Sequence, residues 1–284
     1  MNTSDTDDDR RLSLRERLAK RLVTPDVEEM VDKVPKQVGS FGYDAWGYDE
    51  SRVKLGAGLT KALYERYFHV SAHGLENIPP KGRVLIIGNH SGQLPMDGML
   101  VGYAMLSNTV APRAPRAMME RFLPGVPFLG NFLNSIGAVV GDPINCARML
   151  EAEEAIIVFP EGVRGSGKPY RKRYQLQRFG TGFLHLAMTH QAPIIPVGIV
   201  GCEETMPSLG NIKPLARLLG IPYVPLVPSL LPLPARVSLH FGKPIRFDAQ
   251  PCSEREISSR VDHVKDAIAD LIDEGLSQRT RKYF

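Results

Sequence analysis

Cysteine is scarce in this 284-residue chain: it has three, Cys146, Cys202 and Cys252, far apart in the sequence. An odd number without close spacing argues against a disulfide framework and a C-x-x-C zinc motif, and favours a reducing compartment. No uninterrupted apolar run reaches about 18 residues, so an ordinary membrane-spanning helix is not expected. The start, MNTSDTDDD, lacks the apolar core of a secretory signal and is too acidic for a transit peptide.

A large excess of one charge is also missing, since 35 Lys and Arg face 31 Asp and Glu. That balance does not by itself indicate nucleic-acid binding. Hydrophobic residues make up 43% and charged residues 23%, which is typical of a globular chain. Proline is the exception, because 23 of 284 residues exceeds the usual share of about 5%.

The N-terminal region changes character abruptly. Residues 1–9 are expected to be disordered, and the following RRLSLRERLAKRLV places Leu14, Leu18 and Leu22 on one face of a basic helix. Such a helix either lies on an anionic membrane surface or packs on the domain with its basic face solvated. The sequence leaves both interpretations open.

Buried strands and helices alternate along the rest of the chain. Strands are expected at 84–88, 138–140, 156–159, 194–200 and 237–241, and helices at 55–68, 99–106, 145–153 and 182–190. This alternation predicts an α/β fold, with a mostly parallel central sheet flanked by helices, an N-terminal helical extension and a C-terminal amphipathic helix. Ser253 and Glu256 form a capping box that starts the last helix, and Gly275 is the expected stop.

Segment 214–235, PLARLLGIPYVPLVPSLLPLPA, contains one charged residue, Arg217, and six prolines. Proline at this density prevents a continuous helix. The segment is either an apolar loop covering the sheet or a surface that meets lipid, and we expect membrane contact or a wall for an acyl chain.

Two segments could carry chemistry, and each follows an expected strand. In the first, GNHSGQLPMDG, His90 precedes Asp97 by seven positions, and a carboxylate beside an imidazole is the usual base-and-orienter pair. A structural alternative is that His90 caps the strand and Asp97 the next helix. The second, FPEGVRGSGK over 159–168, combines glycines with cations that can approach an anion, as do the basic residues that continue to 178.

Taken together, His and Asp after one strand, F-P-E-G after a later strand and the Pro-Ile-Ile-Pro-Val of 193–197 resemble the glycerolipid and lysophospholipid acyltransferases, of the 1-acylglycerol-3-phosphate acyltransferase type. The resemblance covers residues 70–245. It implies that His90 is the general base that deprotonates an acceptor hydroxyl and that Asp97 orients it. It further implies a binding site for the polar head of the acceptor at Glu161, Gly162, Arg164 and Lys168. The acyl chain is expected beside Ile195, Pro196 and Val197.

The chain departs from the family pattern in two places. Six residues separate His90 from Asp97, where the family usually has four. The block that usually ends in a phosphate-binding Arg reads here GAVVGDP over 137–143, without Arg. Candidate substitutes for that cation are Arg113, Arg116, Arg148 and Lys168. A neutral acceptor such as monoacylglycerol is therefore the alternative to lysophosphatidate or another lysophospholipid.

The expected function is transfer of a fatty acyl group from acyl-CoA or acyl-carrier protein to a glycerolipid hydroxyl, without a metal or redox cofactor, since a thioester is already activated. Backbone amides near Gly92 or Gly162 are the candidate oxyanion donors. We expect a tail and membrane-proximal extension over 1–69 and an acyltransferase domain over 70–284. The enzyme is expected in the cytoplasm, peripherally on the inner face of a membrane, with an acyl donor and a lipid as partners and no nucleic acid; the oligomeric state is left open.

Two competing functions remain. A Ser/His/Asp lipid esterase would use water as acceptor, but the chain has no G-x-S-x-G motif. A non-catalytic membrane- or nucleic-acid-binding module would use the basic 164–178 loop, would bind in a strongly salt-dependent manner, and would leave the His/Asp segment unexplained.

Overall fold

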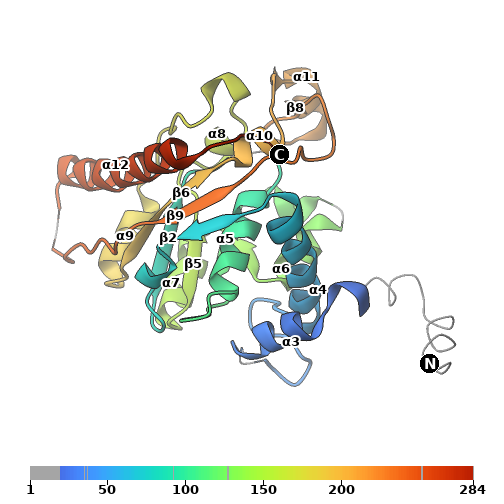
Figure 1. The fold of residues 1–284 in the computed structure, drawn as a ribbon. Coiled ribbons are helices and arrows are strands. Elements are labelled where there is room, and N and C mark those ends of the chain that lie inside the picture. The colour runs from blue at the N-terminus through green and yellow to red at the C-terminus, as the bar shows by residue number, and fades with distance from the viewer. Residues whose placement is uncertain are drawn as a thin grey trace, which may run out of the picture.

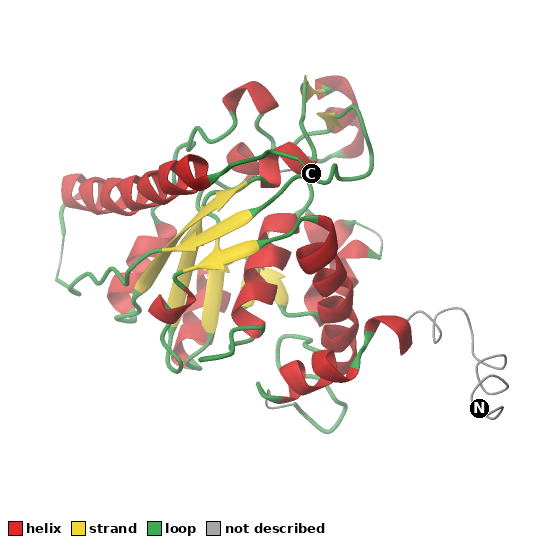
Figure 2. Ribbon diagram, in the orientation of Figure 1, coloured by secondary structure: helices red, strands yellow, loops and turns green. Residues whose placement is uncertain are grey.

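The computed structural model describes residues 20–34, 36, 38–91, 93–126, 128–250 and 252–283. The expected disordered start and most of the expected basic helix lie outside these residues. Figure 1 shows a central layer of strands with helices packed on both of its faces, and Figure 2 distinguishes the two kinds of element by colour.

Among the described residues, seven strands form the main sheet, in the order β1-β9-β6-β2-β5-β3-β4. Their bounds are β1 Ser71–His73, β2 Val84–Gly88, β3 Arg116–Met119, β4 Ala138–Val140, β5 Ala155–Val158, β6 Ile194–Val200 and β9 Ser238–Phe241. All neighbours pair in parallel except β6 and β9, which are antiparallel. Parallel strands covered on both faces need continuous apolar runs, as in the VLIIG of β2 and the AIIV of β5. The predicted mostly parallel α/β sheet is confirmed.

Alternate side chains of the strands face different helical layers. Leu85 and Ile87 of β2 belong to the cluster of buried residues that includes side chains of α7 (Pro143–Glu151), α9 (Gly182–Thr189) and α12 (Glu254–Gln278). Val84 and Ile86 belong to the cluster on the opposite face, with side chains of α5 (Met96–Leu106). The sheet is therefore the middle layer of three.

The N-terminal helices pack onto helix α5. Helix α3 spans Pro25–Asp32, and α4 spans Glu50–Lys61 and continues as a π-helix, η1, over Ala62–Tyr67. Val27, Val53 and Ala57 share a buried cluster with Leu106 of α5. The boundary at residue 69 remains a prediction, but α3 and α4, which precede it, share a buried cluster with α5. Among the described residues, no helix is both long enough and apolar enough to cross a membrane.

The remaining elements are short. The 3-10 turns are η2 Leu75–Asn77, η3 Leu123–Gly125 and η4 Tyr170–Lys172. The short helices are α6 Leu129–Ser135, α8 Val163–Ser166, α10 Cys202–Thr205 and α11 Lys213–Leu219. Strands β7 Gly210–Asn211 and β8 Pro225–Leu226 form a separate antiparallel pair. Helix α11 is compatible with its proline, because Pro214 lies in the first turn, where no backbone donor is needed.

Two details of the predicted helices need correction. The capping box of Ser253 and Glu256 is confirmed, but Gly275 does not end α12, which continues to Gln278. Gly275 is instead a point of close packing: a Cβ there would lie 2.7 Å from Nε2 of His240 on β9. Helix α4 begins at Glu50, earlier than predicted, because the Asp49 side chain accepts a hydrogen bond from the Arg52 amide as an N-cap.

Candidate active site

The candidate site lies at one edge of the sheet. Strands β2, β5, β3 and β4 are parallel, so their carboxyl ends meet at the same edge, where sites of open α/β sheets form. His90 follows β2, Glu120 follows β3, and Phe159 and Glu161 follow β5. The pairing of β2 with β5 thus brings together His90 and Glu161, which lie 71 positions apart in the sequence.

His90 and Asp97 form a direct hydrogen bond. Nδ1 of His90 lies 2.6 Å from Oδ2 of Asp97, whose side chain is completely buried. With the proton of the ring on Nδ1, the carboxylate fixes the tautomer and leaves Nε2 as the acceptor. Asp97 is held in turn by the backbone amides of Ser91, at 2.8 Å, and Gly98, at 2.7 Å. The pair has the geometry of a general base and its orienting group.

The six-residue spacing does not prevent this pairing. Pro95 is the N-cap of α5, and Asp97 lies in the first turn of that helix. The helix therefore delivers the carboxylate to the strand end from which His90 projects. Gly92, within the intervening loop, lies outside the described residues.

The pKa of His90 is raised above its ordinary value. Burial lowers the pKa, but the charge and hydrogen bond of Asp97, together with the charges of Glu161 and Glu120, outweigh burial and favour the imidazolium. A proton arriving on the ring is therefore stabilised, as a general base requires.

Three further residues fix the position of His90. Glu161, itself buried, accepts a 2.9 Å hydrogen bond from the His90 amide. The Asn89 side chain clamps the backbone of Ile199 on β6, donating to its carbonyl at 3.0 Å and accepting from its amide at 2.7 Å. The ring of Phe159 stacks on the imidazole, with centroids 4.7 Å apart and planes inclined by 10°.

The residues expected to bind a polar head are mostly engaged within the protein. The second oxygen of Glu161 accepts from the Gln177 amide at 2.7 Å, so this side chain anchors loops. Lys168 is buried and pairs with Glu203 at 2.9 Å. The Gly162 amide donates to the carbonyl of Phe159 at 3.0 Å. Arg164 is exposed and donates to the carbonyl of Arg178, so it is the member of the set that remains accessible to a ligand.

The arginines that were expected to substitute for the family's phosphate-binding Arg are also not at the candidate site. Arg116 is buried between Asp44 and Glu154, and Arg113 donates to the carbonyls of Pro79 and Glu153. Arg148 is exposed on α7. The structure therefore brings neither Arg113 nor Arg116 to His90.

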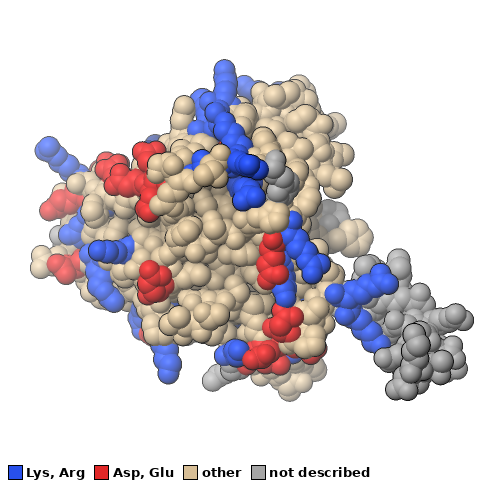
Figure 3. Space-filling model, in the orientation of Figure 1, with Lys and Arg blue, Asp and Glu red and all other residues tan. Residues whose placement is uncertain are grey.

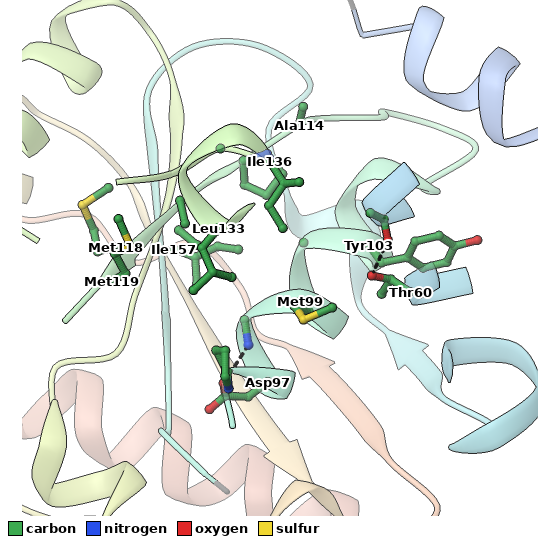
Figure 4. Close-up of a pocket in the computed structure, with 18 of the residues that line it drawn as sticks. Thr60, Asp97, Met99, Tyr103, Ala114, Met118, Met119, Leu133, Ile136 and Ile157 are labelled. Carbon is green, nitrogen blue, oxygen red and sulfur yellow. Dashed lines mark hydrogen bonds between the residues drawn. The ribbon is translucent and has the colours of Figure 1, made fainter. Parts of the chain in front are cut away.

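An apolar cavity of about 170 Å³ opens beside His90 and runs between α4, α5 and the strands β3 and β4. Its walls include Val53 and Ala57 of α4, and Met99, Gly102 and Tyr103 of α5. Figure 4 shows Asp97 at one side of this space, Met118 and Met119 at another, and Thr60 and Tyr103 near each other across it. Among the described residues, no Lys or Arg lines the cavity; its acidic and imidazole side chains are His90, Asp97 and Glu120, and two tyrosines, Tyr48 and Tyr103, add phenol groups.

Strand β6 does not contribute to this cavity. Ile195 and Val197, expected beside an acyl chain, are buried in the sheet core, and Pro196 pairs with Ile87 and lies against Gly242. None of the three belongs to the cavity wall. Among strands at the centre of a sheet, continuous apolar sequence reflects burial on both faces, so it does not identify a ligand wall.

Sequence reasoning missed the most informative parts of the site. Asn89 and Phe159 lie within the two quoted segments, but no role was predicted for either, because hydrogen bonds to the backbone and stacking of rings follow no distinctive sequence spacing. The α4 wall comes from a segment outside the resemblance. Among the described residues, no group of three or more His, Cys, Asp and Glu side chains could hold a metal ion.

Comparisons with known proteins indicate the family. Residues 69–200 match the family model described as "Acyltransferase". An uncharacterized protein of Mycobacterium tuberculosis is 36% identical over 217 residues, covering 73% of this chain and 61% of the relative. The human "DGAT1/2-independent enzyme synthesizing storage lipids" is 28% identical over 205 residues, covering 71% of this chain and 60% of the relative. This chain thus spans about 60% of the length of these relatives.

The fold also matches a solved structure. The crystal structure of the 1-acyl-sn-glycerophosphate (LPA) acyltransferase PlsC from Thermotoga maritima aligns with a TM-score of 0.56, covering 82% of this chain and 84% of that one. At 19% sequence identity, the similarity is one of fold.

Proposed function

The chain belongs to the acyltransferase family, and we propose from this premise that it transfers a fatty acyl group from acyl-CoA or acyl-carrier protein to a hydroxyl of a glycerolipid. The observation that carries the proposal is the His90–Asp97 pair at the wall of an apolar cavity. A base-and-orienter pair supplies the proton transfer, and the cavity offers a site for a hydrocarbon chain.

In the proposed reaction, Nε2 of His90 takes the proton of the acceptor hydroxyl as its oxygen attacks the thioester carbonyl carbon. Asp97 stabilises the imidazolium that forms. The tetrahedral intermediate then collapses: the carbon–sulfur bond breaks, the new ester bond remains, and the thiolate takes the proton from the imidazolium. His90 is thereby returned to its neutral state.

We propose that the acyl chain occupies the cavity between α4 and α5, in place of the expected site at β6. The support is its apolar wall and its opening beside His90. Gly102 lies in this wall, and a Cβ added there would meet its nearest neighbour outside the helix, Pro115, at 3.8 Å. A larger side chain at this position therefore has room to project into the space proposed for the chain.

Gly102→Leu is accordingly expected to shift the enzyme toward shorter donors. Because each buried methylene is worth about 0.8 kcal/mol, loss of space for two of them lowers the palmitoyl-to-octanoyl ratio of kcat/KM by about tenfold. The ratio is measured with matched acyl-CoA donors. Gly182→Leu, at a helix start with open space around it, is the control and leaves the ratio unchanged. An unchanged ratio in Gly102→Leu would place the chain elsewhere.

The acceptor class follows from charge. Lysophosphatidate and other lysophospholipids carry phosphate, for which a cation is the usual partner. The cation-free cavity wall, the internal pairing of Lys168, Arg113 and Arg116, and the carboxylate of Glu120 all favour a neutral acceptor such as monoacylglycerol. The exposed Arg164 is the residue that would bind the phosphate of a phosphorylated acceptor.

A product assay tests both levels of the proposal. One acyl-CoA is offered with lysophosphatidate, other lysophospholipids and monoacylglycerol, and products are identified by mass spectrometry. We expect a new ester, with transfer to monoacylglycerol favoured by at least about tenfold, equivalent to about 1.4 kcal/mol. Faster transfer to lysophosphatidate contradicts the neutral acceptor, whereas free fatty acid without a new ester indicates an esterase.

We further propose that the enzyme works while bound peripherally to a membrane on its cytoplasmic face. Glycerolipid acceptors with long chains reside in bilayers, so an enzyme without a bilayer contact would have to extract each molecule into water. The burial of their chains makes that extraction costly, at about 0.8 kcal/mol per methylene.

A further inference from the structure

Eight exposed apolar side chains are gathered in one region of the chain, between residues 209 and 231. We call these residues the leucine surface: Leu209, Ile212, Leu215, Leu218, Leu219, Leu226, Leu230 and Leu231. Leu218, Leu230 and Leu231 are 81%, 87% and 76% exposed. Single exposed leucines are ordinary, but a gathering of this size is typical of an interaction site.

Local structure holds these side chains together. Leu215, Leu218 and Leu219 occupy positions i, i+3 and i+4 of α11 and so share one helix face. The backbone amides of Leu209 and Ile212 donate to the carbonyls of Leu226 and Val224, which joins the two arms of the segment. The prolines of 214–235 remove backbone donors, which lowers the cost of placing irregular backbone in an apolar medium.

The exposed charge of the stretch of chain that contains the leucine surface, residues 162–247, has a single sign. Between residues 162 and 247 the only acidic residues are Glu203 and Glu204, and both are buried. They pair with Lys168 at 2.9 Å and with Arg279 at 2.8 Å. The exposed cations of the same stretch include Arg164, Arg171, Lys172, Arg178, Lys213, Arg217 and Arg236. In Figure 3, Lys and Arg side chains run over the region of α8 and the loop after it, beside the largely uncharged surface over α11 and β8.

This surface is attached to the loop that holds His90. The Asn211 side chain donates to the carbonyl of Gly167 at 2.8 Å, and the Tyr170 amide donates to the carbonyl of Ser208 at 2.7 Å. Two residues before Gly167, Gly165 lies so close to His90 that a Cβ would be 2.8 Å from the histidine's own Cβ. Whatever binds the leucine surface is therefore held beside the catalytic pair.

We propose that the leucine surface is a docking site for an anionic bilayer, with its leucines entering the lipid and the surrounding Arg and Lys contacting the headgroups. Apolar side chains flanked by cations, in a stretch of chain without exposed carboxylates, match the interface of a membrane that carries negative lipid. This inference rests on the proposed function, since docking delivers a lipid acceptor to His90. An acidic carrier protein could use the cations, but it would have no need of so many exposed leucines.

Vesicle binding of the full chain tests the proposal. The probe is phosphatidylcholine vesicles with and without phosphatidylglycerol, assayed by co-sedimentation. The triple variant Leu218→Ser, Leu230→Ser, Leu231→Ser is expected to bind phosphatidylglycerol vesicles at least about tenfold more weakly. Arg171→Glu with Lys172→Glu is expected to weaken binding about tenfold and to reduce its salt dependence. The control is a triple variant that removes exposed apolar side chains elsewhere, Phe41→Ser, Val110→Ser, Ile144→Ser, and it is expected to leave vesicle binding unchanged.

A second measurement separates this inference from the proposed function. Acyl transfer to a short-chain acceptor dispersed in detergent requires no docking, so the leucine variant is expected to retain wild-type turnover there. If no variant and no wild-type protein transfers acyl groups, the proposed function fails while vesicle binding can still be measured. Equal vesicle binding by the wild type and the leucine variant overturns the docking proposal. It is also overturned if the wild type binds an acidic carrier protein but not vesicles, and the leucine substitutions abolish that binding.

Discussion

Replacement of His90 by alanine is expected to lower kcat for acyl transfer by at least about a thousandfold, within the range typical of a lost general base. The variant keeps the apolar cavity and Asp97, so donor binding is expected to remain close to that of the wild type. Rates are measured with saturating acyl-CoA, with product formation followed by mass spectrometry.

The fold should survive this change. His90 contributes a ring stack with Phe159, but its backbone amide still donates to Glu161 in the variant. Thermal unfolding is therefore expected to differ by only a few degrees. His185→Ala, on the exposed side of α9, is the matched control and should have wild-type turnover. Near-normal turnover in a folded His90→Ala protein would end the proposed mechanism.

Asp97→Asn is expected to reduce kcat by about a hundredfold to ten-thousandfold, because the neutral amide no longer stabilises the imidazolium or selects the productive tautomer. The substitution also changes the pH dependence. In the wild type, Asp97 contributes to a His90 pKa above the ordinary value of 6.5. Below that pKa the ring is protonated and cannot accept a proton, so activity rises as pH rises through it.

The rising limb of the pH–rate profile should move to lower pH in Asp97→Asn, since removal of the charge lowers the pKa of His90. Profiles of kcat/KM report the free enzyme and are compared for both proteins. Asp262→Asn, exposed on α12, is the control for removal of a carboxylate. A limb that stays in place, or moves upward, would show that Asp97 does not set the charge state of His90.

The central sheet was predictable because burial on both faces leaves continuous apolar runs in β2, β5 and β6. Strand β3 was not predicted, because its RAMM sequence is short and begins with a cation, Arg116. Burial of Arg116 is possible because it forms ion pairs with Asp44 and Glu154. That compensation involves partners 72 and 38 positions away, so no local pattern contains it.

The pairing of His90 with Asp97 was predictable from the sequence, whereas the burial and internal pairing of Lys168 were not. His90 and Asp97 are joined by one loop and one helix turn, so their proximity is a local property. Lys168 reads as an accessible cation in sequence, but it is buried against Glu203, a residue that follows a different strand. A sequence records which charges exist, whereas long-range packing decides which of them remain accessible.

The cavity wall supplied by α4 also bears on how such enzymes are inherited and dissected. The segment that matches the family begins at residue 69, yet Val53, Gly56, Ala57 and Thr60 precede it and face the same space as His90. A fragment cut at the family boundary would keep the His90–Asp97 pair and lose one side of the cavity. With the acyl chain in this cavity, as we propose, the smallest functional unit includes the preceding helix. Chimaeras that exchange α4 between relatives are then expected to exchange chain preference while His90 and Asp97 stay constant.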